Sequence, residues 1–126
     1  MKTRSILFLV ILLIPFYSCR KNDEFRFTLY LENTGSIPNC KTIKVTIDGM
    51  DIITNQLCAA GVSPNVTTFS FNIKDGNHKM KAEIIEDSKV FDQVVNFDNS
   101  QKFGYLTYNN TSSEFTFFLN STGGID

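Results

Sequence analysis

The sequence has no Trp, a single His and only three Cys among its 126 residues. His and Cys supply much of the general acid–base, nucleophilic and metal-binding chemistry of proteins, so their scarcity leaves little from which to build a catalytic or metal centre. Positive charge is not in excess either, because 12 Lys and Arg face 13 Asp and Glu. The chain therefore lacks the basic surface that neutralises phosphates, and we expect no nucleic-acid partner.

The common motifs of enzyme active sites are also missing. There is no G-x-S-x-G nucleophile elbow, no phosphate-binding Gly loop and no acidic run with the spacing of a calcium site. The single His, His78, follows the turn at residues 75–77 and has no nucleophile or orienting acid beside it in the sequence. We therefore expect that the protein is not an enzyme and has no catalytic residue, no cofactor and no metal.

The N-terminal residues have the features of a secretory signal peptide. Lys2 and Arg4 give a positive start, and Ile6–Ile14 is an unbroken run of nine apolar residues. A helix that spans a membrane needs about 20 apolar residues, so this run is too short to cross a bilayer and is typical of a cleaved export signal. We expect residues 1–18 to form the signal peptide.

The end of this segment, Ser18–Cys19, resembles the signal of a bacterial lipoprotein, in which a Cys follows a small residue at the cleavage site and is lipidated. Phe16 departs from the usual Leu, in a way familiar from lipoproteins of the Bacteroidetes type, and the charged stretch 20–24 resembles their surface-export signal. The resemblance implies lipidation of Cys19, a tether over residues 19–24, and a lipid-anchored protein of the outer membrane that faces the periplasm or the cell surface. An ordinary signal peptide with a Cys near its cut is the alternative.

From residue 25 onward, apolar residues alternate with polar ones. Phe25, Phe27, Leu29 and Leu31 form one such run. Alternation with a period of two is typical of strands buried on one face. It predicts seven strands, at 25–33, 42–48, 66–74, 78–86, 89–97, 103–108 and 114–120.

Turn residues separate these runs. Asp75–Gly76 is the strongest hairpin signal, and Asp48–Gly49 is a second turn. Turns at intervals of about 8–12 residues are typical of antiparallel sandwiches. We therefore predict an all-β fold, an immunoglobulin-like antiparallel β-sandwich, over residues 25–122. For residues 50–65 a strand, a short helix and a loop all remain open.

Two short segments resemble small envelope β-domains of the PEGA or immunoglobulin-like kind. In those domains a V-x-I-D-G strand end and a later x-G-x-H-x strand start recur, and this chain has them at Val45–Gly49 and around Gly76–His78. The resemblance implies a β-sandwich without catalytic residues.

With Cys19 assigned to lipid, Cys40 and Cys58 remain. An even number of Cys in an exported protein favours a disulfide, which here would join the second strand to the 50–65 segment. Two free, buried thiols are the alternative.

Several aromatic residues occupy strand positions that alternate with those expected to face the core. Tyr30 and Phe118 alternate with inward neighbours, and Phe103 and Tyr105 do so if Leu106 faces the core. Rings gathered on one face of a sheet can stack on sugars or dock a protein, unless loops or the other sheet cover them. We therefore expect a non-enzymatic binding or structural module of the cell envelope, with these four residues as a candidate binding face for an envelope protein or a glycan. An accessory role in a larger uptake or adhesion system is the alternative.

Overall fold

The computed structural model describes residues 24–59, 61–62 and 65–123, and all of the regular secondary structure in them is β-strand. The predicted signal peptide and Cys19 lie outside the described residues. The strands are β1 (Glu24–Asn33), β2 (Cys40–Ile47), β3 (Met50–Cys58), β4 (Val66–Lys74), β5 (Gly76–Ile84), β6 (Lys89–Phe97), β7 (Phe103–Asn109) and β8 (Glu114–Asn120). Within the described ranges, no helix is long and apolar enough to cross a bilayer.

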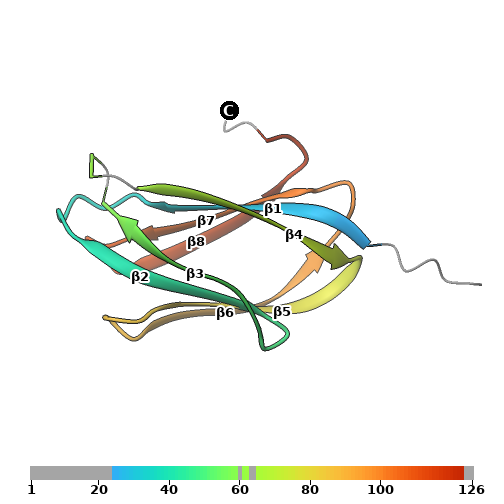
Figure 1. Cartoon of the computed structure of the whole chain (residues 1–126), viewed down its shortest axis with the longest axis horizontal. Coiled ribbons are helices and arrows are strands. Elements are labelled where there is room, and N and C mark those ends of the chain that lie inside the picture. The colour runs from blue at the N-terminus through green and yellow to red at the C-terminus, as the bar shows by residue number, and fades with distance from the viewer. Residues whose placement is uncertain (1–23, 60, 63–64, 124–126) are drawn as a thin grey trace, which may run out of the picture.

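The strands form two four-stranded sheets that pack face to face (Figure 1). Sheet A has the order β4-β1-β7-β8, and sheet B has the order β3-β2-β5-β6. All neighbouring strands are antiparallel except β1 and β7, which are parallel. The predicted all-β, immunoglobulin-like sandwich is confirmed. The described residues form eight strands rather than the seven predicted, because β3 occupies the first part of residues 50–65, whose secondary structure could not be assigned from the sequence.

Asp75–Gly76 is not a hairpin turn, so that prediction is wrong. The strand before it belongs to sheet A and the strand after it belongs to sheet B, so these residues carry the chain from one sheet to the other. Gly76 has a φ of 124°, so the dipeptide does mark a sharp bend. The two-residue hairpin is instead at Asp48–Gly49, where φ values of 51° and 78° suit the turn that the twist of a hairpin favours.

The core lies between the two sheets and is formed by their inward residues, most of them on the central strands β1, β7, β2 and β5. The ring of Phe27 from sheet A meets that of Phe97 from sheet B edge to face, with centroids 4.8 Å apart. Burying one large apolar side chain contributes about 1.5–3 kcal/mol. A Cβ on Gly104 would lie 2.7 Å from Cζ of Phe27, so β7 can approach β1 this closely only with Gly at that position.

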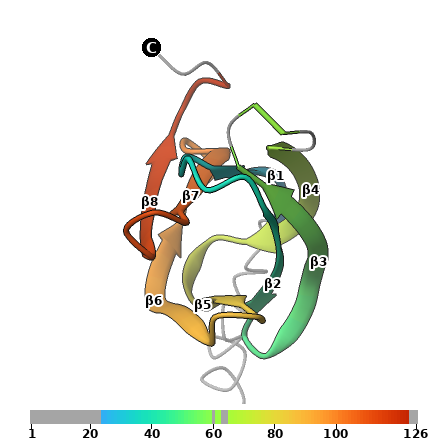
Figure 2. The same cartoon turned by 90° about the vertical axis from the view of Figure 1, so that its left-hand side faces the viewer.

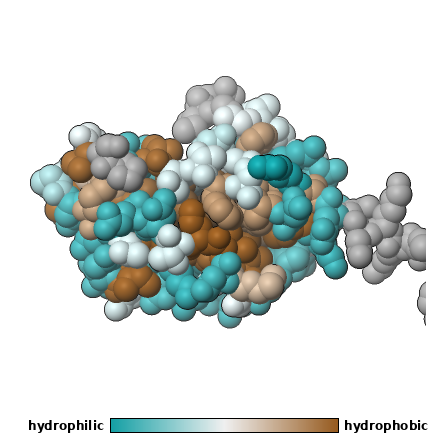
Figure 3. Space-filling model, viewed as in Figure 1, coloured by the Kyte–Doolittle hydropathy of each residue, from teal (hydrophilic) through white to brown (hydrophobic). Residues whose placement is uncertain are grey.

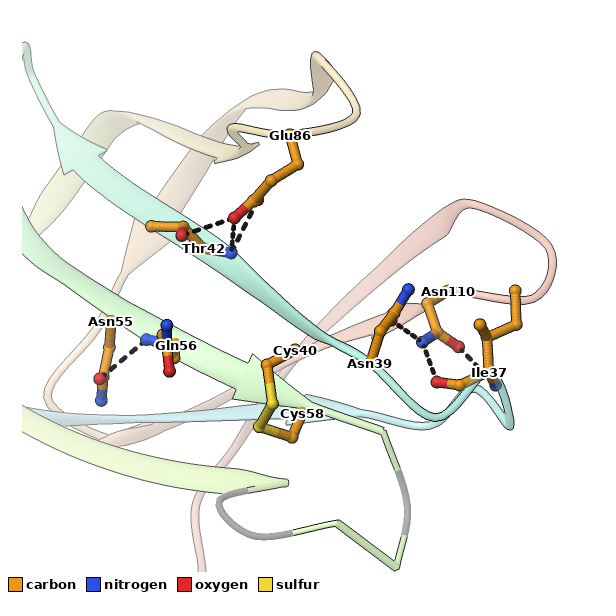
Figure 4. Close-up of a disulfide and its surroundings, with 9 residues drawn as sticks. All are labelled: Ile37, Asn39, Cys40, Thr42, Asn55, Gln56, Cys58, Glu86 and Asn110. Atoms are coloured by element: carbon orange, nitrogen blue, oxygen red, sulfur yellow. Dashed lines mark hydrogen bonds between the residues drawn. A yellow bond between two sulfur atoms is a disulfide. The ribbon is translucent and has the colours of Figure 1, made fainter.

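A disulfide joins Cys40 to Cys58, as predicted (Figure 4). The two residues stand directly opposite each other at the start of β2 and the end of β3. The residues are 18 apart in sequence, and closing a loop of this size in the unfolded chain is worth about 3 kcal/mol in the entropic description. The bond thus fixes the end of the strand whose sequence is least clearly β.

Asn110 closes the same end of the molecule by bonding to the loop between β1 and β2 (Figure 4). Its Nδ2 donates to the carbonyl oxygen of Ile37 at 2.8 Å and to Oδ1 of Asn39 at 3.0 Å. Oδ1 of the buried Asn33 accepts the backbone N–H groups of Gly35 and Asn110. A Cβ on Gly35 would overlap the side chain of Asn110 and lie 2.5 Å from its backbone nitrogen, so this loop has no room for a side chain there.

We expect Gly35→Ala to lower the free energy of unfolding by about 2 kcal/mol or more, because the added methyl group must displace Asn110 and its hydrogen bonds. Denaturant unfolding followed by circular dichroism measures the change. Thr34→Ala, an exposed neighbour, is the control and should alter stability by less than about 0.5 kcal/mol. Equal stability of the two variants would contradict this account of the loop.

Candidate functional site

The structure brings the four residues of the candidate binding face together on the outer surface of sheet A. Tyr30 in β1, Tyr105 in β7 and Phe118 in β8 stand opposite one another on three adjacent strands. The ring centroids of Tyr30 and Tyr105 are 4.8 Å apart, and those of Tyr105 and Phe118 are 4.9 Å apart. The ring of Phe103 is tilted and lies 6.4 Å from that of Tyr30. We call these four residues the aromatic row.

The spacing of the row follows from the spacing of the strands. Neighbouring strands lie about 4.7–4.9 Å apart, so rings on directly opposed residues stand parallel at almost the same distance. The planes of the two stacked pairs differ by only 7° and 12°. Tyr105 is consequently just 3% exposed although it is on the outer face, whereas Phe118 at the sheet edge is 43% exposed. Neighbouring rings therefore cover Tyr105.

This stacking limits what the row can bind. The ring of Tyr105 is stacked on both sides, so neither of its faces can receive a sugar ring. The chain that follows β8 passes over another part of the row, since a Cβ on Gly123 would lie 3.2 Å from Phe103 and 3.5 Å from Oη of Tyr30. The accessible aromatic surface is thus concentrated at Phe118, on the edge strand.

The surroundings of the row are almost free of charge. On the same outer face it is flanked by Thr28, Val66, Thr68, Ser70, Thr107, Thr116 and Asn120. Glu32 is the one acid in these adjacent rows of the described sheet. The outer face of sheet B instead carries the ion pairs Lys44–Asp51, Lys79–Asp92 and Lys81–Glu83. Aromatic residues with little charge around them are typical of the centres of protein interfaces.

Figure 2 shows β3 and β4 on the side of the sandwich away from β8. A pocket of about 270 Å³ opens between these two strands. Its apolar lining is visible as the brown area between these strands in Figure 3. The walls are Ile47, Ile52, Phe71 and Ile73, and Met50, 66% exposed, lies at the mouth. The predictions from sequence did not include this pocket.

A β-bulge forms part of the wall of the pocket. The register between β2 and β3 shifts after Val45, so that Ile52 is an extra residue in β3. Ile52 and Ile53 are therefore both half-buried, instead of one facing the core and one the solvent. Two consecutive Ile residues that break the alternation were the signal in the sequence.

The rim of the pocket contains His78, which ties two turns together. Its Nδ1 lies 2.6 Å from Oδ2 of Asp48, and its Nε2 lies 2.9 Å from the carbonyl oxygen of Lys74. The backbone N–H of Lys79 donates to the other carboxylate oxygen of Asp48 at 2.9 Å. The hydrogen bonds from His78 and Lys79 lower the pKa of Asp48. Because both ring nitrogens of His78 are engaged within the protein, its contacts are those of a structural residue.

A second polar cluster fixes the β5–β6 hairpin to β2, at the other end of the sandwich. Lys41 Nζ lies 2.8 Å from Asp87, whose second oxygen accepts the hydroxyl of Tyr108 at 3.0 Å. These two partners lower the pKa of the Asp87 carboxyl. Beside them Glu86 accepts the backbone N–H and hydroxyl of Thr42 (Figure 4). The bonds join segments distant in the sequence, so the cluster stabilises the fold.

No protein-family model matches the sequence, and no curated protein matches it either. Among the described residues, no three His, Cys, Asp or Glu side chains gather where they could hold a metal ion. In the part of the chain that the structure describes, the aromatic row and the pocket are the two candidate sites.

We expect the stabilisation by Asp48 to disappear in acid. Its pKa in the folded protein is below the ordinary value of 3.8, so the contribution is fully present above that pH and is lost as the pH falls through the folded-state pKa. The difference in unfolding free energy between the wild type and Asp48→Asn should accordingly shrink as the pH is lowered towards that range. Urea unfolding at a series of pH values measures it.

Glu114→Gln is the control for loss of one exposed negative charge, since Glu114 lies outside the pocket rim. A difference between wild type and Asp48→Asn that stays constant down to strongly acidic pH would contradict a role of the Asp48 carboxylate.

Proposed function

We propose that the protein is a lipid-anchored, non-enzymatic binding module of the cell envelope, and that the aromatic row is its docking surface. The observation that carries this proposal is the row itself, three stacked rings and a fourth beside them on a face with little charge. Exposed apolar patches commonly mark interaction sites, and Phe118, the ring of the row on the edge strand, is 43% exposed.

Support for the anchor comes from the sequence and from the Cys residues. The disulfide uses two of the three Cys, which leaves Cys19, the residue that follows the export signal, for lipid. A single acyl chain holds a protein only marginally on a membrane, while two or more chains give stable attachment. The resemblance to lipoproteins implies several chains on this residue.

A short tether would keep the domain close to the membrane. β1 begins at Glu24, the residue with which the predicted tether ends. The five residue steps from Cys19 to Glu24 span at most about 18 Å. The partner of the aromatic row is therefore expected among components at or near the membrane surface.

The geometry favours a protein partner over a glycan. Sugars bind aromatic residues through open ring faces, and the stacking leaves Phe118 as the most exposed ring of the row, at 43%. A protein surface can instead cover the whole row and the Thr residues that flank it. A glycan stacked on Phe118 alone is the second candidate, favoured by the 43% exposure of that ring.

The anchor is tested by Cys19→Ser. We expect this variant to move from the membrane fraction to the soluble fraction, because the thiol that carries the lipid is gone, and its intact mass should lack the lipid adduct. Ser18→Ala keeps a small residue before the cleavage site and should fractionate like the wild type. If Cys19→Ser remains in the membrane fraction, the anchor proposal is wrong.

The docking surface is tested by Phe118→Ala. Binding to purified envelope proteins and to an array of defined glycans should fall about tenfold or more, as expected for an aromatic residue central to an interface. Val94→Ala removes a side chain that is 70% exposed on the outer face of β6, and it should leave binding unchanged. Equal binding by both variants would exclude the row as the docking surface, and loss on the glycan array alone would favour the second candidate.

A further inference from the structure

β8 is an edge strand with little to prevent another strand from pairing with it. It lies at the end of sheet A, where β7 is its only neighbour among the described strands. Its sequence, EFTFFLN, contains no Pro, no Gly and one charge, Glu114, at its first residue. Natural proteins usually block such edges with Lys, Pro, a bulge or a covering loop, because strands rich in aromatic residues readily pair with other chains.

The other three edges of the described sandwich have features that β8 lacks. β3 contains the bulge beside the pocket, which interrupts its regular register. β6 carries Lys89 and Asp92 along its length. β4 ends in Lys74 and lies against β3 of the opposite sheet, where Asn55 donates a hydrogen bond of 3.0 Å to Thr67. By comparison, the edge of β8 is the most open to a new strand.

Both faces of β8 carry apolar side chains that the fold covers only in part. The inward residues Phe115, Phe117 and Leu119 are half-buried, although they pack against the core. On the outer face Phe118 stacks on Tyr105 towards the sheet and is 43% exposed. A strand added to this edge would bury further surface of these residues on both faces at once.

We propose that β8 pairs antiparallel with β8 of a second copy of the chain, about a two-fold axis at Phe117, so that the two copies share one eight-stranded sheet. The inference rests on the proposed role of the aromatic row as a docking surface, and it names the partner that meets the row at its β8 end. Closed two-fold pairs of identical surfaces are the commonest form of soluble oligomer.

The sequence of β8 is compatible with pairing to itself. The axis places these residues opposite each other: Phe117 and Phe117, Phe115 and Leu119, Thr116 and Phe118, Glu114 and Asn120. Like charges on directly opposed residues destabilise a sheet, and this register contains none. Its inward pairs are apolar. Of the outward pairs, Thr116 with Phe118 places Thr beside an aromatic ring, a combination that stabilises cross-strand contacts, and Glu114 meets the uncharged Asn120.

The experiment measures the mass of the full chain in its Cys19→Ser form, in which a lipid cannot hold two copies in one micelle. Sedimentation equilibrium over a range of concentrations should give a dimer that dissociates on dilution. Thr116→Lys puts a charge on an exposed residue of the proposed interface and should weaken dimerisation at least tenfold, with an unchanged circular dichroism spectrum. Val94→Lys, on the exposed face of β6, is the matched control and should dimerise like the parent.

The register is tested separately with the double variant Thr116→Cys and Phe118→Cys. Mild oxidation should link two copies, because the two-fold axis places the thiol introduced at position 116 of one copy opposite the thiol introduced at position 118 of the other. A monomer at all concentrations, a dimer that Thr116→Lys does not weaken, or a failure to cross-link would each overturn the pairing. If the chain is monomeric but Phe118→Ala still weakens binding to the envelope protein or glycan, only the pairing of two copies is wrong. If Phe118→Ala does not weaken that binding, the proposed docking surface is wrong instead.

Discussion

The parallel pairing of β1 with β7 is the constraint on which the rest of the structure depends. It inserts a late strand of the chain beside the first one and so completes the middle of sheet A. The same register sets Tyr105 opposite Tyr30 on the outer face and Gly104 against Phe27 on the inner face. The core and the aromatic row are thus two consequences of one strand alignment, and a shift by one residue would exchange the inward and outward side chains of β7.

The strands could be predicted from local sequence because alternation is a local property. The parity of residues such as Phe27 and Val45 determines which side of each strand is buried, whatever strand lies beside it. Which strands pair with each other could not be predicted in the same way. Asp75–Gly76 and Asp48–Gly49 have the same turn chemistry, yet the first moves the chain to the opposite sheet and the second closes a hairpin. The two differ in backbone conformation, because Asp48 and Gly49 both have a positive φ, whereas in the other dipeptide only Gly76 does.

The candidate sites show the same division between local and non-local information. Alternation alone placed Tyr30 and Phe118 on the outer face, and Phe103 and Tyr105 on condition that Leu106 faces the core. Stacking depends on the register across three strands, and it leaves Tyr105 covered and Phe118 accessible. The pocket also combines distant segments, since His78 and Asp48 are 30 positions apart in the chain. Local sequence indicates which side chains are available for a site, and the pairing of strands decides which of them meet.

The proposed lipid anchor and the proposed pairing through β8 constrain each other. A two-fold axis reverses the strand direction, so the Glu24 ends of the two copies would lie at opposite ends of the shared sheet. A strand of 10 residues such as β1 is about 33 Å long, roughly twice the reach of about 18 Å available to the tether. A pair that stands upright on one membrane would hold one of its tethers too far from the bilayer. Two anchored copies can therefore pair in one membrane only if their strands run along its surface, which leaves the aromatic row to face either the bilayer or a partner lying beside it.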